Sequence, residues 1–159
     1  MFAALVFAFA ASTGSLSVAA TPDQTEAWRP LHAYIGTWKS VGAEKRTRIY
    51  ASAATNHHLE ITESGASHDR AVWGIVSYDA ARGVLVLRRF VADGDALDLA
   101  LDPSSSTAEH LVFEGPGADS RTRVTYDRPG WNTFVERVER SSGGAPYALL
   151  LETRFERKD

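Results

Sequence analysis

Five histidines are the first side chains to consider for metal binding or catalysis: His32, His57, His58, His68 and His110. His57 and His58 are adjacent in a strand-like segment, so their side chains face opposite ways and cannot share a metal ion. His58 and Glu60 lie on one face, and two ligands at this spacing could begin a zinc site. Because no third ligand follows at a recognisable spacing, we predict no metal site.

Nucleophilic catalysis finds no support in the sequence. The chain has no cysteine, no Gly-x-Ser-x-Gly motif and no glycine loop of the phosphate-binding kind. Glu136 and Glu139 face opposite sides of one strand-like segment, so paired carboxylates for acid–base catalysis would have to come from different strands. We therefore name no catalytic residue and no cofactor.

Arginine is the charged residue best suited to a binding site in this chain. Seven arginines lie in strand-like segments, mostly in the second half: Arg88, Arg89, Arg121, Arg123, Arg137, Arg140 and Arg154. In a closed barrel half of the strand positions point inward, so at least one is expected to reach the interior. A buried guanidinium requires a partner, such as Glu136, Glu152 or a ligand carboxylate. The alternative is that each lies on the outer wall with its charge in water.

Aromatic residues are the other candidate set, with four Trp, five Tyr and seven Phe in the chain. Six are expected to line or fill a barrel interior: Tyr50, Trp73, Phe90, Tyr126, Phe134 and Phe155. The alternative is a packed core, because the side chains of a small barrel can fill it. Together with the arginines, they give these predicted ligand-binding residues: Tyr50, Trp73, Arg88, Phe90, Arg123, Tyr126, Phe134 and Arg154.

Strand-like segments would position these residues, because from Trp38 onward apolar and polar side chains alternate with a period of two. After the segment that begins at Gly36, they cover 44–52, 55–63, 69–79, 84–91, 96–101, 109–114, 121–126, 131–140 and 147–156. Turn residues separate them, including Asp93-Gly94 and Arg128-Pro129-Gly130. Such short connections join antiparallel neighbours, and a meander avoids exposed edges by closing. The predicted fold is all-β, a single antiparallel up-and-down β-barrel of about 8–10 strands.

Residues 21–30 hold the one predicted helix, which Thr21 or Asp23 can cap. Trp28 and Leu31 fall on one side of it at helical spacing. A proline near its end keeps the helix short. We expect it to plug one end of the barrel and to bury Trp28 and Leu31.

Residues 1–20 differ in composition from the rest of the chain. Met1–Ala11 is almost wholly apolar, and small residues follow up to Val18-Ala19-Ala20, a pattern typical of a secretory signal cleaved near Ala19 or Ala20. No Lys or Arg precedes the apolar run, which departs from that pattern. The run is shorter than the roughly 20 residues that cross a bilayer. We predict a periplasmic or secreted protein with one domain, residues 21–159, and no stable membrane insertion after cleavage.

The charge of the chain argues against nucleic acid as a partner. Its formal net charge is −3, and its 17 basic residues are scattered among 20 acidic ones. Neutralising phosphates requires a clustered excess of Lys and Arg. The sequence leaves the oligomeric state open.

The segment Gly36-Thr37-Trp38-Lys39 resembles the opening of the calycin superfamily, which includes lipocalins, fatty-acid-binding proteins and nitrobindin-like barrels. In these families a Gly-x-Trp begins the first strand, and a basic residue near the end of the barrel covers the tryptophan. Arg154 or Arg157 is placed to do so, and the resemblance makes Gly36, Trp38 and Arg157 structural residues. The middle segment, 74–79, resembles a group of bacterial lipocalin-like domains.

Three differences limit what the resemblance implies. Where fatty-acid-binding proteins insert a helical lid, Val41-Gly42-Ala43 leaves room only for a turn. The nitrobindin-like barrels carry a haem-binding histidine near the C-terminus, whereas no histidine follows His110 here. Their second glycine after the tryptophan is Ser40 in this chain. A haem site is therefore not expected.

Taken together, the sequence predicts non-enzymatic binding of a small apolar or amphipathic molecule in a barrel cavity. The aromatic interior would bury its body, and Arg88, Arg123 or Arg154 would orient an acidic head group such as a carboxylate. Two alternatives remain. One is an enzyme that uses a Tyr, His or Glu as acid or base in the cavity, and the other is a filled barrel that serves as a protein-interaction scaffold.

Overall fold

The computed structural model describes residues 24–43, 45–52, 58–65, 73–90, 96–116 and 119–158. Several sequence-based expectations lie outside these residues: the secretory signal in 1–20, the helix cap at Thr21 or Asp23, His57, His68, and the turn at Asp93-Gly94.

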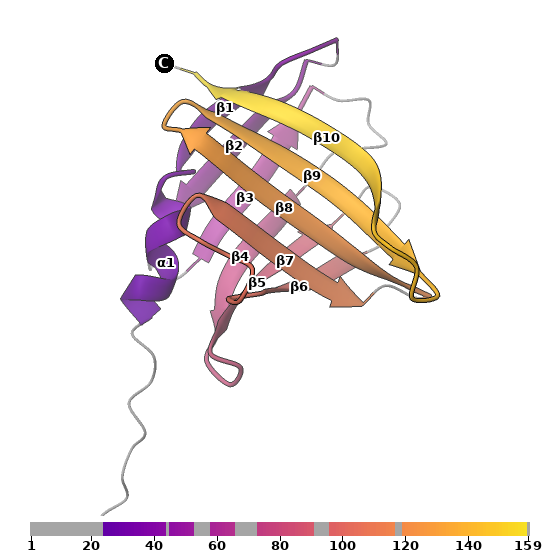
Figure 1. Ribbon diagram of the computed structural model, residues 1–159. Helices are drawn as coiled ribbons and strands as arrows, with labels where there is room; N and C mark the ends of the chain where they lie inside the picture. The colour runs from indigo at the N-terminus through magenta and orange to yellow at the C-terminus, as the bar shows by residue number, and fades with distance from the viewer. Residues whose placement is uncertain are drawn as a thin grey trace, which may run out of the picture.

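The described chain forms a closed barrel of ten strands with the helix α1 (Gln24–His32) at its N-terminal side (Figure 1). The strands are β1 (Gly36–Ser40), β2 (Thr47–Ser52), β3 (His58–Ser64), β4 (Trp73–Asp79), β5 (Val84–Phe90), β6 (Ala96–Leu101), β7 (His110–Pro116), β8 (Ser120–Gly130), β9 (Thr133–Ser142) and β10 (Ala148–Arg157). Among the described residues, no helix has the length and apolar character needed to cross a bilayer.

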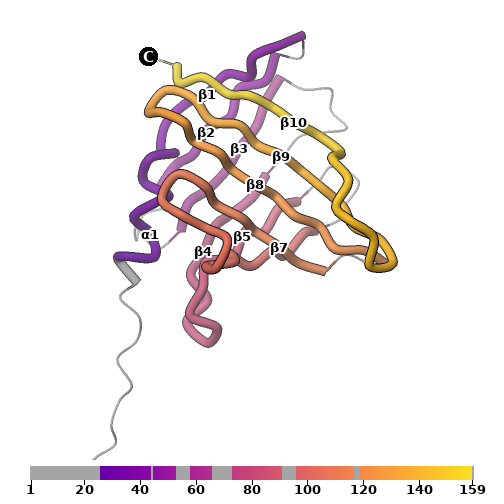
Figure 2. Tube along the Cα trace, in the orientation of Figure 1, coloured from indigo at the N-terminus to yellow at the C-terminus, as the bar shows by residue number. Residues whose placement is uncertain are grey.

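The strands follow one another around the barrel in sequence order, and every pair is antiparallel (Figure 2). The first and last strands close the circle, with Trp38 opposite Arg157 and Ser40 opposite Phe155. The prediction of an up-and-down barrel is confirmed. One predicted turn is wrong: residues 128–130 belong to β8, which has a bulge there, and the chain reverses at Trp131 and Asn132.

Side chains that alternate with a period of two in the sequence point alternately into and out of the barrel. In β3, Leu59, Ile61 and Glu63 are buried, whereas the first and last residues of the strand are exposed. This alternation places a polar side chain, Glu63, inside the barrel because its position in the strand dictates its direction. Strand geometry therefore brings charge into the interior as well as apolar side chains.

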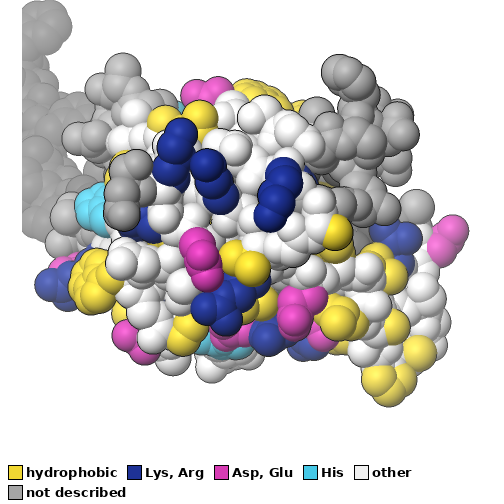
Figure 3. Space-filling model, turned by 90° about the horizontal axis from the view of Figure 1, so that it is seen from above, with side chains coloured by type: hydrophobic (Ala, Val, Ile, Leu, Met, Phe, Trp, Pro, Cys, Tyr) yellow, Lys and Arg dark blue, Asp and Glu magenta, His cyan; other side chains and the backbone are white. Residues whose placement is uncertain are grey.

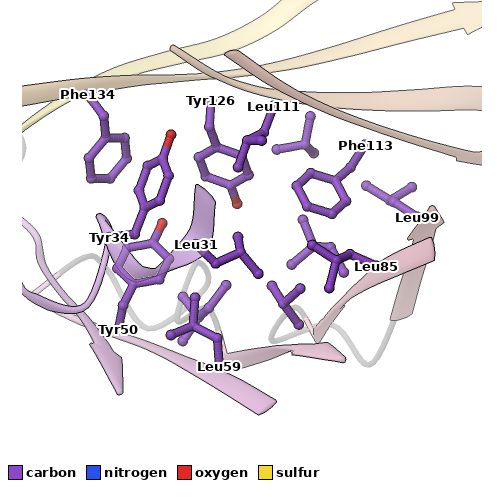
Figure 4. Close-up of a cluster of buried hydrophobic side chains, with 14 of the residues drawn as sticks. Leu31, Tyr34, Tyr50, Leu59, Leu85, Leu99, Leu111, Phe113, Tyr126 and Phe134 are labelled. Carbon is purple, nitrogen blue, oxygen red and sulfur yellow. The ribbon is translucent and has the colours of Figure 1, made fainter. Parts of the chain in front are cut away.

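The helix α1 covers one end of the barrel, as predicted. Trp28 and Leu31 are buried and join the core cluster with Leu59 and Tyr126. Figure 4 shows Leu31 lying among side chains that come from the surrounding strands. The helix closes this end through apolar side chains, because its backbone hydrogen bonds are internal to the helix.

Trp38 and Arg157 form the seam where the barrel closes. Trp38 is fully buried, and its Nε1 donates a hydrogen bond to the carbonyl of Tyr34 at 2.7 Å. The guanidinium carbon of Arg157 lies 4.3 Å from the centroid of the Trp38 ring, within the range of a cation–π contact. Arg157 also donates to the carbonyls of Ala33 and Ile35 at 2.7 and 2.9 Å. The basic residue that covers the tryptophan is therefore Arg157, and Arg154 lies on the outer wall with its side chain 57% exposed.

Gly36 is required where the chain enters β1. Its φ of 133° is a conformation that L side chains rarely adopt, and an added Cβ would lie 2.7 Å from Nη1 of Arg157. We expect Gly36→Ala to lower the free energy of unfolding by about 1–3 kcal/mol, through backbone strain or displacement of Arg157. Urea unfolding followed by tryptophan fluorescence measures the change.

Gly130→Ala is the matched control for this substitution. No atom lies within 4 Å of a Cβ placed at Gly130, and its φ lies outside the left-handed region. The control should change the free energy of unfolding by no more than about 0.5 kcal/mol. Equal losses in the two variants would show that the entry to β1 has no special conformational requirement.

Candidate functional site

Five charged side chains from four strands meet inside the barrel. Arg46 lies just before β2 and Arg48 lies on it, while Glu63, Arg89 and Glu136 come from β3, β5 and β9. All five residues are buried. We call them the interior ion network. The network joins walls of the barrel that lie far apart in the sequence, and Arg89 reaches Glu136 at 3.2 Å.

Arg48 is the centre of this network. Its Nε donates to Oε2 of Glu63 at 2.8 Å, and its Nη2 lies 2.6 Å from the same carboxylate oxygen. Nη1 and Nη2 both donate to the Glu136 carboxylate, and Nη1 also donates to the Tyr50 hydroxyl at 3.3 Å. All three guanidinium nitrogens are engaged with protein acceptors, and the guanidinium also lies over the ring of Phe155 at 4.4 Å. Arg48 therefore uses its hydrogen-bond donors within the protein and not for a ligand.

Glu136 stays ionised in this environment. Burial by itself would raise its pKa, but the charges of Arg48 and Arg89 outweigh burial and lower the pKa to about 2. Its Oε2 accepts from Arg48, and its Oε1 accepts from both Arg48 and Arg89. A carboxylate with so low a pKa and with both oxygens bonded is a poor general base.

A small cavity lies between the network and α1. It offers ≈ 10 Å³ to the centre of a water-sized sphere, which is about the room that one water molecule needs. Its walls carry no formally charged side chain and consist of Leu31, Tyr34, Tyr50, Leu59, Ile61, Val76, Leu111, Phe113 and Tyr126. The lining residues belong to the cluster of buried hydrophobic side chains drawn in Figure 4.

Three tyrosines add hydroxyls to this apolar lining. Among the described residues, the hydroxyls of Tyr34 and Tyr126 have no hydrogen-bond partner. Figure 4 shows the Tyr126 hydroxyl pointing in among the apolar side chains. Burial and the nearby Glu136 carboxylate raise the pKa of Tyr126 well above its usual value, so its phenol stays protonated. The Tyr126 hydroxyl lies close enough to the Glu136 carboxylate to help lower the pKa of Glu136, but the pair does not have the geometry of a hydrogen bond.

Three of the predicted binding residues lie inside the barrel, and two of these line the cavity. Tyr50 and Tyr126 contribute to its walls. Phe134 is fully buried and packs edge-on against Tyr34 and Trp38, with ring centroids 5.3 and 4.8 Å apart. Phe155, the sixth aromatic expected inside, is also fully buried.

Trp73 and Phe90 lie on the outer wall, which corrects the expectation that they face inward. Their rings are 4.8 Å apart and the residues are 45% and 39% exposed. In β4 the inward position is Gly74, which packs against the backbone of Arg88 and the side chain of Arg89. The strands β4 and β5, which hold Trp73 and Phe90, carry apolar residues on both faces, so the sequence pattern did not reveal which face is inside.

The three arginines predicted as anchors also lie on the outer wall. Arg88 pairs with Asp98 at 3.0 Å and Arg123 pairs with Glu139 at 2.8 Å. Arg154 is half-exposed, as described above for the barrel seam. On the face seen in Figure 3, basic and acidic side chains lie next to one another, as expected for a solvated wall. The arginine that does face inward near Arg88 is its neighbour Arg89.

The sequence analysis missed Arg46, Arg48 and Glu63 as interior residues. A signal was present, because Arg46, just before β2, alternates with Arg48 and Tyr50 on it, and Tyr50 was predicted to face inward. The same parity argument would have placed both arginines inside. Two buried cations on one strand require carboxylates, and Glu63 and Glu136 supply them.

The described histidines lie outside the interior ion network. His58 is exposed on the outer wall, and its neighbour on that face, Glu60, accepts a hydrogen bond from Trp73. His110 contacts Asp127 on the outer wall, and Asp127 also pairs with Arg137. Within the described part of the chain, no three His, Cys, Asp or Glu side chains are grouped to hold a metal ion.

No protein-family model matches the chain, and no curated protein matches it. The closed ten-strand antiparallel barrel is compatible with a calycin-like fold, and that statement rests on the architecture alone.

Glu136 should make stability dependent on acid pH. Its pKa falls from 4.5 to about 2 on folding, so below pH 4.5 the unfolded chain binds a proton that the folded chain does not. We expect the free energy of unfolding to fall by about 3 kcal/mol between pH 4.5 and pH 2 from this group. Urea unfolding at a series of pH values measures the slope.

In Glu136→Gln this part of the slope should disappear. The variant should also lose about 3–5 kcal/mol at neutral pH because Arg48 and Arg89 lose their buried partner. Glu152→Gln is the control, since its carboxylate is half-exposed and pairs with Arg137 on the outer wall. It should cost no more than about 1 kcal/mol. An unchanged acid slope in Glu136→Gln would contradict the assignment.

Removing the hydroxyl of Tyr126 and that of Tyr50 should change the free energy of unfolding in opposite directions. Tyr126→Phe removes a buried hydroxyl without a partner, and we expect it to raise the free energy of unfolding by about 1 kcal/mol. Tyr50→Phe removes an acceptor from Arg48, and we expect a loss of about 1.5–3 kcal/mol. Thermal unfolding of the two variants compares them directly, and a clear loss in Tyr126→Phe would contradict the prediction.

Proposed function

We propose that this protein binds a small, largely apolar molecule in the cavity beneath α1, without transforming it. The observation that carries the proposal is an apolar-lined cavity within the core cluster, to which α1 contributes one lining residue, Leu31. Apolar walls with a few polar groups are typical of small-molecule sites. The expected arginine anchors take no part in this site.

Binding requires α1 to move. The cavity accommodates about one water molecule, so a ligand must displace part of its wall. The strands are held on both sides by neighbouring strands around the closed barrel. The helix, by contrast, is held to the barrel mainly by the side chains of Trp28 and Leu31. The helix is therefore the part of the wall that yields at the lowest cost.

The driving force would be burial of apolar surface. A molecule that buries about 200 Å² of apolar surface gains about 5 kcal/mol at roughly 25 cal/mol per Å². The cost of moving α1 and of ordering the ligand is subtracted from this gain. We therefore expect dissociation constants of about 1 mM or weaker for ligands of this size.

The interior chemistry favours binding over catalysis. The buried carboxylate nearest in register to the cavity tyrosines is Glu136, which lies opposite Tyr126. Its pKa of about 2 and its bonds to Arg48 and Arg89 leave it unsuited to accept a proton from a substrate at neutral pH. The enzyme alternative would need an acid or base that the described lining of the cavity supplies only as tyrosine.

The lipocalin-like classification and the export of the protein belong to the same proposal. The arrangement of Gly36, Trp38 and Arg157 supports placing the chain among lipocalin-like members of the calycin superfamily. The composition of residues 1–20 supports export to the periplasm or beyond the cell. A soluble, exported barrel would meet small apolar molecules outside the cytoplasm.

A pair of neighbouring substitutions on β4 tests the site. Val76 lines the cavity, whereas Ile75 points to the outer wall. We expect Val76→Phe to fill the cavity and weaken binding of an uncharged fluorescent apolar probe, Nile red, at least about tenfold, because the ring occupies the ligand's space. Ile75→Phe should leave binding unchanged. Circular dichroism confirms that both variants fold.

Leu31→Ala provides the opposite change. Removing this wall should enlarge the cavity and strengthen probe binding, while it lowers the free energy of unfolding by about 2–5 kcal/mol. Native mass spectrometry of protein purified from its own host then reports any bound compound and its mass. If no variant binds the probe and no compound is found, the binding proposal fails, and the scaffold alternative gains support.

A further inference from the structure

We infer that the ligand presents an uncharged hydrogen-bond acceptor, such as a ketone, ester or amide carbonyl, to the hydroxyls of Tyr126 and Tyr50. The inference rests on the proposed function, because it names the chemistry of the molecule that enters the same cavity. It departs from the sequence-based expectation of an acidic head group held by arginine.

Tyr126 supplies the first donor. The residue is 4% exposed, and its hydroxyl has no hydrogen-bond partner among the described residues. The hydroxyl points inward among the side chains that line the cavity (Figure 4). Leaving a buried hydroxyl without a partner is costly, so such groups occur where a ligand or a water molecule completes them. A carbonyl oxygen in the cavity would accept its proton.

Tyr50 supplies the second donor from the opposite wall. Its oxygen already accepts a hydrogen bond from Nη1 of Arg48 at 3.3 Å, which leaves its own O–H to donate. Tyr50 and Tyr126 lie on β2 and β8, and both contribute to the lining of the cavity. Two hydroxyl donors from different strands, in a cavity otherwise lined by apolar groups, match an acceptor oxygen on an otherwise apolar molecule.

The acceptor should be uncharged for three reasons. No lining residue of the cavity carries a formal charge. The guanidinium of Arg48, the arginine that contacts a lining residue, has all three nitrogens engaged with Glu63, Glu136 and Tyr50. The Glu136 carboxylate, which lies opposite Tyr126 in the sheet, already pairs with both Arg48 and Arg89. A carboxylate would therefore lose its hydration without gaining a cation, whereas a carbonyl loses far less.

Three compounds with the same ring test this inference. Cyclohexanone carries the neutral acceptor, methylcyclohexane carries none, and cyclohexanecarboxylate carries the charge. Ligand-observed NMR titrations at neutral pH measure their affinities for the wild-type protein and for Leu31→Ala. Because the cavity of this variant should be wider, it distinguishes a compound that is too large to enter from one whose polar group is not accommodated. We expect cyclohexanone to bind most tightly and cyclohexanecarboxylate to bind at least about tenfold more weakly.

Tyr126→Phe is the diagnostic variant. It should weaken binding of cyclohexanone by about 3- to 10-fold and leave methylcyclohexane unchanged, because only the ketone uses the hydroxyl. Protein labelled at the Cζ carbon of tyrosine provides a second readout. The Tyr126 resonance, assigned by its absence in Tyr126→Phe, should shift when cyclohexanone is added and stay in place with methylcyclohexane.

The outcomes separate this inference from the proposed function. If cyclohexanecarboxylate binds most tightly, or if Tyr126→Phe leaves the ratio of ketone to hydrocarbon affinity unchanged, the inference is wrong while the binding site stands. If cyclohexanone binds without moving the Tyr126 resonance, the hydroxyl is not its donor and the inference is again wrong. If none of the three compounds binds wild type or Leu31→Ala, the proposed function fails and the inference fails with it.

Discussion

The pairing of Glu136 with Arg48 and Arg89 divides the barrel interior into a charged part and an apolar part. A carboxylate buried in a protein must be paired, and here the partners come from β2 and β5, while the carboxylate comes from β9. The ion pairs therefore link strands that are not neighbours in the sheet. They occupy part of the interior with three arginines and two glutamates, and they leave the space beneath α1 to apolar side chains and tyrosines.

Residues near the beginning and the end of the described chain close the barrel around these two parts of the interior. Gly36 lets the chain turn into β1, Trp38 is buried beneath Arg157, and Arg157 ties the carbonyls of Ala33 and Ile35 to the last strand. The segment between α1 and β1 is thus fastened to β10. Within the described residues, α1 packs on the core through the buried side chains of Trp28 and Leu31, and we expect the barrel to yield most readily there.

The candidate site follows from how completely Arg48 is engaged within the protein. An arginine with a free fork would select an acidic ligand, but Arg48 has engaged its nitrogens with Glu63, Glu136 and Tyr50. Among the described residues that line the cavity, the side chains that can donate a hydrogen bond are tyrosines. A phenol with a raised pKa donates without carrying charge. This combination of apolar walls and neutral donors suits a neutral acceptor better than an anion.

The sequence by itself determined the all-β barrel, the helix that covers one end and the role of Trp38, because period-two alternation, turn residues and a Gly-x-Trp start are local features. It also placed Tyr50 and Tyr126 inside. Only the tertiary structure decided which face of β4 and β5, the strands of Trp73, Arg88 and Phe90, points inward. The sequence left this open because both strands carry apolar residues on both faces and β5 also has two adjacent arginines. The partners of Arg48 were decided there too. They come from strands far away in the sequence, and only barrel closure brings Glu63 and Glu136 to the same guanidinium.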